Sequence, residues 1–199
     1  MKVLIVARTR ISNRVCVGGL DADNTSLRLY EKGWTYPPAS SPYQVGQVWE
    51  MTLLARPSLQ PPHLEDVAVT TARHLSTVRD LAASLRKRVV PWAGGVTALF
   101  EGKLRFTANS RGYIEAPNLP SRSTGFWTPD RDLTHADIDG KAYYRCGGYE
   151  LSYVGVDQPI PTIPAGTLVR VSLARWWKPR DAAPDFPERC YLQLSGWYL

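Results

Sequence analysis

The side chains best suited to bind an anion lie in two arginine-rich parts of the chain, one near each end. The first part holds Arg8, Arg10 and Arg14 around the end of an opening β-rich run, with Arg28 further on. Guanidinium groups along a curved sheet neutralise phosphates, and they also stack on bases. Charge along an exposed sheet edge equally discourages pairing with another chain. The cluster therefore indicates either a phosphate-binding groove or a solvated strand edge.

The second part, VSLARWWKPR at residues 171–180, places two adjacent tryptophans among basic residues. Neighbouring residues of a strand point to opposite faces, so one of Trp176 and Trp177 is expected to enter the core while the other lies at the surface. An exposed tryptophan beside Arg175 and Lys178 would stack a base for about 1–3 kcal/mol. The alternative is a tryptophan that seals an interface between two modules, with Arg175 packed on it.

Carboxylates crowd the stretch FWTPDRDLTHADID around His135. They are Asp130, Asp132, Asp137 and Asp139. Clustered carboxylates can hold Mg²⁺ for phosphoryl chemistry. Their spacing matches no metal-binding motif, however, and TPD and DIDG are typical turn sequences because Asp bonds its own backbone. Turns are therefore the simpler interpretation of this stretch.

Another polar group lies in PPHLED, where His63, Glu65 and Asp66 could ligate a metal or transfer protons. No second His or Cys stands at a metal-ligand spacing, so a polar loop is the default interpretation. The phosphate-binding glycine motifs, the nucleophile elbow and the HExxH motif are all absent from the sequence. The sequence thus predicts no catalytic residue, no metal site and no cofactor.

The chain is basic, with 24 Lys and Arg against 18 Asp and Glu and a pI of about 9.3. This balance favours an anionic partner. Hydrophobic residues make up 44% of the 199 residues, enough for a buried core. No apolar run approaches the ~18 residues of a membrane span, so no membrane partner is expected. Three scattered cysteines without a CxxC pair argue against disulfides and zinc, and favour the reducing cytoplasm.

Alternating apolar residues between turn signals predict short strands in both halves of the chain. In the first half they are expected at 2–7, 14–20, 25–30, 44–56 and 67–72. Aromatic residues concentrate in the second half, where four of seven Trp and seven of ten Tyr follow residue 110. This shift in composition predicts two β-rich modules, 1–110 and 111–199.

One helix is predicted, over 74–90, because its apolar residues recur at three- and four-residue steps. Ser76 or Thr77 would cap its start, and Pro91 would end it. A β-meander, a helix and further strands are typical of the OB-fold, in which the helix lies between the third and fourth strands. We therefore predict a mainly β fold: two small OB-like β-barrels, with one main α-helix in the first. An SH3-like or split barrel is the alternative.

The sequence also resembles a known family, the bacterial dual OB-fold (dual OB-containing) domain proteins. The resemblance rests on ARTR after the opening strand, on VCVGGL, LRLY and PPHLEDV, and on the closing CYLQLSGWYL. It covers nearly the whole chain and implies two OB-like barrels. It also implies nucleic-acid or nucleotide binding within a bacterial conflict or antiphage system, with a partner protein from the same system. It supplies no established functional residues.

We therefore expect a cytoplasmic protein that binds single-stranded DNA or RNA, or a nucleotide, in a basic cleft that carries aromatic side chains. The expected binding residues are Arg8, Arg10, Arg14, Arg28, Arg175, Trp176, Trp177 and Lys178. One alternative is an enzyme acting on nucleic acid or nucleotides, centred on the Asp130 and Asp132 pair or on the PPHLED group. Another is an adaptor whose aromatic surface docks a partner protein.

Overall fold

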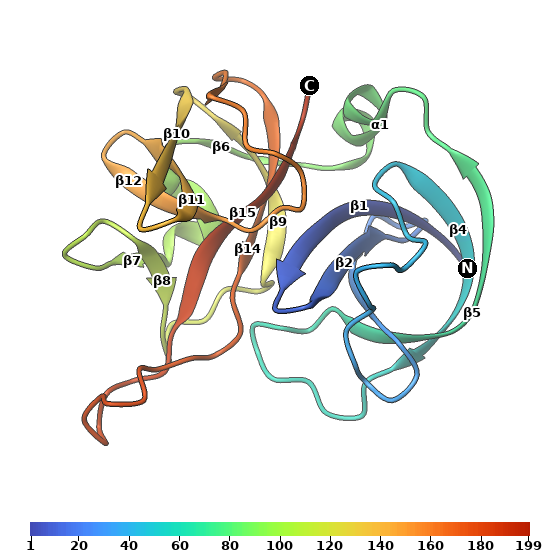
Figure 1. Cartoon of the computed structure of the whole chain (residues 1–199), viewed down its shortest axis with the longest axis horizontal. Coiled ribbons are helices and arrows are strands. Elements are labelled where there is room, and N and C mark those ends of the chain that lie inside the picture. Colours follow the sequence, from blue (N-terminus) through green and yellow to red (C-terminus); the bar gives the residue numbers. More distant parts are fainter.

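The computed structural model describes residues 1–199 as two β-rich halves that lie side by side. In Figure 1 the blue-to-green strands β1 to β5 form the half at the right, and the light-green-to-red strands β6 to β15 form the half at the left. No helix in it has the length and apolar character that crossing a membrane requires. Both halves are built from short strands joined by turns, as the alternating pattern of the sequence predicts.

The first half is a closed five-stranded barrel with the strand order β1-β2-β3-β5-β4. Its strands are β1 (Lys2–Ile11), β2 (Arg14–Leu20), β3 (Ser26–Tyr30), β4 (Gln47–Ala55) and β5 (Asp66–Thr77). The β3 and β5 strands pair in parallel, and β4 pairs back onto β1 to close the barrel. This order is that of an OB-fold, a five-stranded Greek-key barrel.

The opening run Val3–Ala7 is buried throughout because β1 packs on both of its faces. Val3 and Ile5 point into the barrel, where they pack with Trp49. Leu4 and Val6 point outward into a cluster that both halves share. A strand with two buried faces explains why the sequence here is a continuous apolar run rather than an alternating one.

The second half is a ten-stranded sheet that repeats the OB order. Its long strands are β9 (Thr124–Pro129), β10 (Leu133–Ile138), β11 (Lys141–Cys146), β12 (Tyr149–Tyr153), β14 (Leu168–Leu173) and β15 (Cys190–Tyr198). The β12 and β15 strands pair in parallel, as β3 and β5 do. The β9 and β10 strands together take the place of a first strand, because β9 pairs with β14 and β10 pairs with β11.

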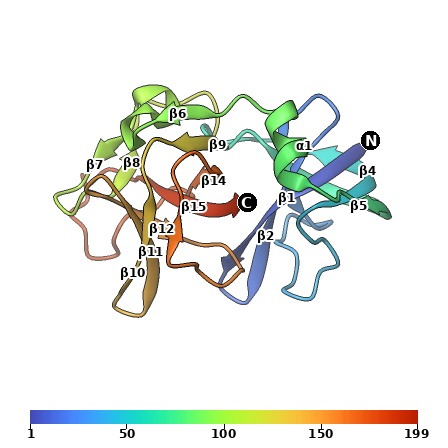
Figure 2. The same cartoon turned by 90° about the horizontal axis from the view of Figure 1, so that it is seen from above.

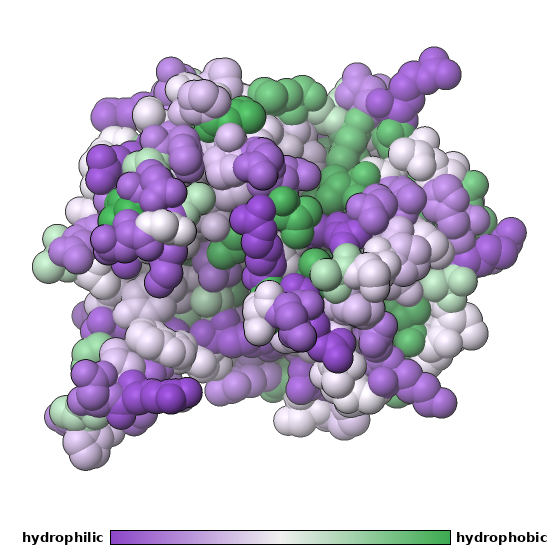
Figure 3. Space-filling view, viewed as in Figure 1, coloured by the Kyte–Doolittle hydropathy of each residue, from purple (hydrophilic) through white to green (hydrophobic).

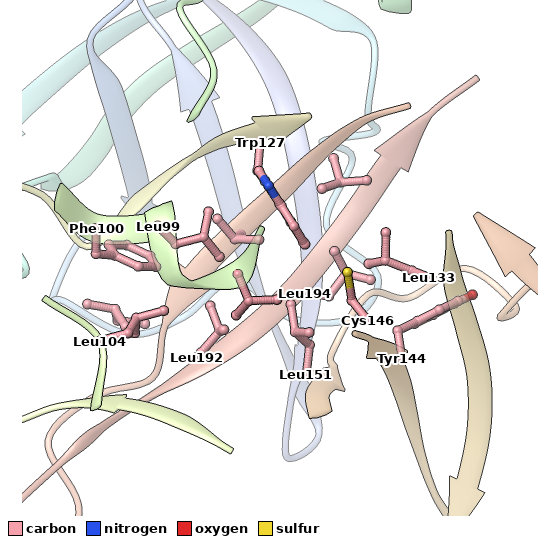
Figure 4. Close-up of a cluster of buried hydrophobic side chains, with 14 of the residues drawn as sticks. Leu99, Phe100, Leu104, Trp127, Leu133, Tyr144, Cys146, Leu151, Leu192 and Leu194 are labelled. Atoms are coloured by element: carbon pink, nitrogen blue, oxygen red, sulfur yellow. The ribbon is translucent and has the colours of Figure 1, made fainter. Parts of the chain in front are cut away.

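Shorter elements complete the second half. They are β6 (Trp92–Gly94), the 3₁₀ segment η1 (Val96–Gly102), β7 (Arg105–Phe106), β8 (Gly112–Ile114) and β13 (Thr162–Ile163). They surround a core of 18 buried residues. Figure 4 shows Trp127 above these side chains, with Leu99 and Phe100 of η1 on one side of the cluster and Tyr144 of β11 on the other. The aromatic residues of the second half therefore serve largely as its core.

The single α-helix, α1 (Leu81–Arg88), is shorter than predicted and lies elsewhere in the fold. The predicted start at residue 74 was wrong, because the β4 and β5 ladder continues to Thr77. Asp80, rather than Ser76 or Thr77, caps the helix, and its side chain accepts a hydrogen bond from Ala83 N at 2.8 Å. Pairing with β4 outweighs the helical spacing of the apolar residues in this segment.

The helix follows the fifth strand of the first barrel instead of joining the third to the fourth. Its Leu85 is fully buried in the cluster between the halves, against Leu4 of β1, Phe126 of β9 and Tyr198 of β15. Figure 2 shows α1 beside β1, on the path from the first half to the second. The helix therefore fastens the two halves together.

The division of the chain into 1–110 and 111–199 remains a prediction. Two contacts bear on where the junction lies. The β6 strand pairs in parallel with β9, and Leu99 and Phe100 of η1 belong to the core of the second half. We propose on these grounds that the second module begins near Trp92.

Candidate functional site

Two adjoining cavities open where the barrels meet. The inner pocket, of about 190 Å³, lies between β1, β2 and β3 of the first barrel and β9, β14 and β15 of the second. Four arginines line it, together with hydroxyl and amide side chains. The arginines are Arg10, Arg28, Arg170 and Arg175. Residues from both halves are therefore needed to form the pocket.

The aromatic cleft is wider, about 760 Å³, and lies at the end of β3 beside the loop that joins β4 to β5. We define it by Tyr30, Trp34, Tyr36, Arg56 and Asp66. Arg175 and Tyr36 line both this cleft and the inner pocket, so the two cavities adjoin at these side chains.

The aromatic rings of the cleft lie tilted against one another, and a guanidinium group contacts two of them. The Tyr30 ring lies 4.8 Å from that of Tyr36 and 6.1 Å from that of Trp34, measured between centroids. The Arg56 guanidinium carbon lies 5.4 Å from the Tyr30 centroid and 5.2 Å from that of Trp34, which are cation–π distances. Tyr30 is buried and Trp34 and Tyr36 are half-buried, so the ring faces open to a ligand are those of Trp34 and Tyr36, with a positive charge beside them.

The backbone at Trp34 is unusual. Its φ angle is 63°, in the left-handed region that bulky side chains rarely occupy. The turn is held by hydrogen bonds from Trp34 N to Glu31 O at 3.0 Å and from Glu31 N to Thr35 O at 2.9 Å. Such conformations cost of order 1–3 kcal/mol and cluster at binding sites. The indole is therefore held at the cleft at the expense of local stability.

Two arginines anchor the loop that carries Trp34 and Tyr36. Arg8 is buried and donates to the carbonyl oxygens of Ala39, Ser41 and Tyr43 at 2.8–3.3 Å. Arg14 donates to the carbonyl oxygen of Tyr36 at 2.6 Å. Both were expected to contact phosphate. The structure places their guanidinium groups on this loop instead, where they position the aromatic cleft.

A buried ionic network forms one wall of both cavities. Asp66 accepts hydrogen bonds from Arg28 at 3.1 Å, from Arg56 at 2.8 Å and from Arg175 at 2.5 Å. Glu65 pairs with Arg28 at 2.5 Å. Three guanidinium groups thus share two carboxylates, and one positive charge is left over. The wall attracts anions.

The charge of Arg175 is secured by its neighbours. Burial disfavours the charged guanidinium, but hydrogen bonds with Tyr36 and Asp66 outweigh that effect and raise the pKa of Arg175. Arg175 also donates to the hydroxyl of Tyr30. Burial raises the pKa of Tyr30, so that its phenol stays protonated. The cleft therefore presents a permanent cation, Arg175, and the neutral phenol of Tyr30 at neutral pH.

His63 and Cys190 lie behind this wall. His63 is fully buried, with Nδ1 3.4 Å from Arg28 Nη1 and Nε2 3.6 Å from Cys190 Sγ. Burial, together with the charges of Arg28 and Arg175, lowers the pKa of His63 to about 3. Burial raises the pKa of Cys190 to about 12. Both groups are neutral at pH 7, which is not the charge state of an activated thiolate and its base.

Arg170 of β14 is the most enclosed cation of the inner pocket, with 2% of its surface exposed. Its Nη2 donates to Thr124 Oγ1 at 3.2 Å, and its guanidinium carbon lies 5.1 Å from the centroid of the Phe126 ring. Nη1 has no hydrogen-bond partner, and no carboxylate pairs with the group. Burial accordingly lowers the pKa of Arg170.

The tryptophan pair divides as the strand pattern predicts, although the chain has left β14 by this point. Trp176 packs against the core of the second half and donates to the carbonyl oxygen of Pro61 at 3.0 Å. Trp177 is 53% exposed, and its neighbour Lys178 is exposed as well. Trp176 thus links the two halves, while Trp177 stands at the base of a loop.

That loop projects from the molecule. It is closed by hydrogen bonds between Trp177 and Arg189 in both directions, at 3.1 and 2.9 Å. Figure 1 shows it at the lower left as an orange-red excursion between β14 and β15, and the matching projection in Figure 3 is mostly hydrophilic. Trp177 and Lys178 line neither cavity. They are therefore separate from the cluster formed by Arg10, Arg28 and Arg175.

The acidic stretch, in which TPD and DIDG were interpreted as turns, also contains a strand, β10, over Leu133–Ile138. Its carboxylates nevertheless support turns. Asp132 Oδ1 accepts a hydrogen bond from Ala165 N at 2.8 Å, and Asp137 Oδ1 accepts one from Gly140 N at 3.0 Å. No group of three or more His, Cys, Asp or Glu side chains is arranged to hold a metal ion.

Several residues of the site were missed at the level of sequence. They are Tyr30, Trp34, Tyr36, Arg56 and Arg170. The aromatic ones occur in YEKGWTY, which was interpreted only as the end of a strand and a loop. Arg170 interrupts the apolar strand LVRVSL. A cation within a strand that must be buried is the signal that could have marked it.

Two OB barrels with a basic, aromatic-lined junction define the class of this protein, a dual OB-fold protein. A family model described as the dual OB-containing domain matches residues 1–197. The chain therefore belongs to that family, and the resemblance noted in the sequence is confirmed. Neither the curated proteins nor the solved structures contain a match to it. OB-folds commonly bind oligonucleotides and oligosaccharides.

Proposed function

We propose that this protein binds single-stranded nucleic acid or a nucleotide in the aromatic cleft. The observation that carries the proposal is the cluster of Tyr30, Trp34 and Tyr36, with the Arg56 guanidinium over the Tyr30 and Trp34 rings. Single strands are bound by aromatic side chains that stack on bases, next to cations that follow the backbone. The cleft supplies both. On the family resemblance, we extend the proposal to a role in a bacterial conflict or antiphage system.

The position of the cleft agrees with this use. OB-folds bind oligonucleotides on the face of their second and third strands, flanked by the loops after the first and fourth. The cleft lies at the end of β3 and beside the loop between β4 and β5, with Arg56 at the start of that loop. The ligand would therefore lie where such barrels bind single strands.

The charge of the site favours an anion. Among the side chains of the cleft, the inner pocket and their shared wall are five arginines, against the two carboxylates of Glu65 and Asp66. The arginines are Arg10, Arg28, Arg56, Arg170 and Arg175. If about three phosphates are neutralised, the slope of log Kd against log salt is about 2, so a fourfold increase in salt weakens binding roughly 20-fold.

The projecting loop offers a second aromatic surface, at Trp177 and Lys178, which was the expectation from the sequence. The structure separates it from the cleft, so single substitutions can tell the two apart. Trp34→Ala removes an indole from the cleft, and Trp177→Ala removes one from the loop. Each variant serves as the matched control of the other.

The test is fluorescence anisotropy of labelled single-stranded DNA and RNA, with mononucleotides as competitors, at two salt concentrations. Trp34→Ala should weaken binding about 5- to 150-fold, the range that corresponds to one stacked base. Trp177→Ala should leave the affinity unchanged. The reverse pattern would move the site to the projecting loop. No binding of any strand or nucleotide by the wild type would refute the function.

A further inference from the structure

We propose that the inner pocket binds a terminal phosphate, with Arg170 as its anchor, so that the site recognises a phosphorylated strand end or a nucleotide rather than an internal phosphodiester. The inference rests on the proposed function, because the adjoining aromatic cleft would hold the base. A phosphate monoester carries more charge than a phosphodiester and has three free oxygens. The chemistry of the pocket matches these properties.

Arg170 carries a buried charge that the protein itself does not neutralise. The side chain is 2% exposed, Nη1 has no partner, and Nη2 has only the Thr124 hydroxyl. Burying an ion without a counter-ion is costly, so buried charges are normally paired. The nearby carboxylates Glu65 and Asp66 are already occupied by other arginines. An anionic ligand would complete the pairing of Arg170.

The strand opposite Arg170 leaves room for its guanidinium group. A Cβ atom on Gly18 of β2 would lie 3.3 Å from Arg170 Nη2 and 3.4 Å from Ala7 Cβ. Any larger residue at this position would push the cation aside. Glycine therefore allows the guanidinium to lie flat against the first barrel, at the edge of the pocket.

Neutral donors surround the cation. Thr124, Ser172, Gln193 and Ser195 line the pocket, and the Ser172 and Ser195 hydroxyl groups lie 2.9 Å apart. Hydroxyl and amide groups can donate to phosphate oxygens beside the planar fork of an arginine. The pocket thus combines one strong cation with several adaptable donors, which suits a small, highly charged anion.

The size of the pocket favours the terminal phosphate of a nucleic-acid strand over an internal phosphodiester. Its volume is about 190 Å³, one quarter of the 760 Å³ of the aromatic cleft. This is room for several waters, since one water needs roughly 10–15 Å³. An internal phosphodiester would have to bring a nucleotide on each side into the space between the barrels. A terminal phosphate needs only one nucleotide, which the adjoining cleft can take.

The experiment compares labelled oligonucleotides of one sequence that end in a 5′-phosphate, a 3′-phosphate or hydroxyls only. The wild type should prefer one phosphorylated end by about 10- to 100-fold, the range expected for one or two charge-assisted hydrogen bonds. Arg170→Met should abolish that preference and leave the affinity for the hydroxyl-ended strand unchanged. Arg79→Met is the control, because this exposed arginine lines neither cavity and should keep the preference.

A second variant covers the case in which Arg170→Met fails to fold. Arg170→Lys keeps the charge but loses the planar fork that binds two oxygens at once. It should reduce the preference for the phosphorylated end to about one third of the wild-type value or less. Mononucleotides and inorganic phosphate form a parallel arm, measured by the rise in Tm of the wild type and of each Arg170 variant. Arg170-dependent stabilisation by these small anions would support the pocket and identify a free nucleotide or phosphate as its source.

The outcomes separate the two proposals. Equal binding of phosphorylated and hydroxyl-ended strands by the wild type would overturn the phosphate pocket and leave strand binding in place. Binding of inorganic phosphate alone, dependent on Arg170, would support the pocket and end the proposed function. A preference that persists in both Arg170 variants would also overturn the assignment. If no strand, nucleotide or phosphate binds, both proposals fall.

Discussion

Mild acid should destabilise this protein through one buried histidine. His63 is fully buried next to the Arg28 guanidinium, and its pKa is lowered to about 3 from an ordinary value of 6.5. In the unfolded chain the same imidazole takes up a proton as the pH falls below 6.5. The folded state cannot take up that proton until the pH nears 3. Protons therefore favour the unfolded state between these values, and stability falls with pH.

The size of the effect follows from the two pKa values. Above pH 7 the imidazole is neutral in both states and makes almost no difference. Proton binding stabilises the unfolded state by RT times the natural logarithm of one plus the ratio of protonated to neutral imidazole in the unfolded chain. At pH 5 this lowers the free energy of unfolding by about 2 kcal/mol relative to pH 7. The folded pKa lies well below pH 5, so its exact value hardly changes this figure.

Urea unfolding at pH 7 and pH 5 measures this loss directly. The comparison is between wild type and His63→Gln, which lacks the titrating group, with His74→Gln on the exposed side of β5 as the control. Between pH 7 and pH 5, wild type and His74→Gln should each lose about 2 kcal/mol more of their free energy of unfolding than His63→Gln. The loss that comes from carboxylate titration is common to all three and cancels in the comparison. The same loss in His63→Gln as in wild type would refute the reasoning, whatever the absolute stability of the variant.

Two further substitutions test the junction between the barrels. Asp66→Asn leaves the guanidinium groups of Arg28, Arg56 and Arg175 with Glu65 as their one remaining carboxylate. The substitution should lower the free energy of unfolding, measured in urea at pH 7, by about 3–5 kcal/mol. A loss below about 1 kcal/mol would show that water already solvates these cations. Leu85→Ala opens a cavity in the cluster shared by both halves and should cost about 2–5 kcal/mol. Calorimetry should still show one transition for the wild type, and two separate transitions would contradict a shared core.

Local periodicity accounts for what could be predicted of the fold. The strands at 14–20 and 25–30 were expected almost as they occur, in β2 and β3, because β-favouring residues alternate between turn signals there, although both faces of these strands become largely buried. Trp176 and Trp177 do differ in burial as expected, but they lie beyond the end of β14, so strand alternation is not the cause. The helix was overextended to residue 74, because residues 74–77 fit a helical stripe and a strand equally well. Only pairing with β4 decides between them.

Only part of the candidate site could be predicted from the sequence, because contacts between residues far apart in the chain leave no local sequence pattern. The basic charge and the resemblance indicated an anionic ligand. Of the eight expected binding residues, Arg10, Arg28 and Arg175 line the inner pocket, and their role in binding stays a prediction. The pairs that define their roles are distant, however: Arg28 and Ser123 are 95 positions apart, and Arg175 and Asp66 are 109 apart. No spacing rule predicts such contacts.

The sequence by itself determined that the chain forms β-barrels, carries excess positive charge and concentrates aromatic residues in its second half. These properties depend on composition and on short-range alternation. Tertiary structure decided that Arg8 and Arg14 hold a loop, that Tyr30, Trp34 and Tyr36 form a cleft, and that Arg170 is buried without a counter-ion. A side chain acquires such a role from the groups packed against it, and here those groups come from the opposite barrel or from a loop folded back over the first.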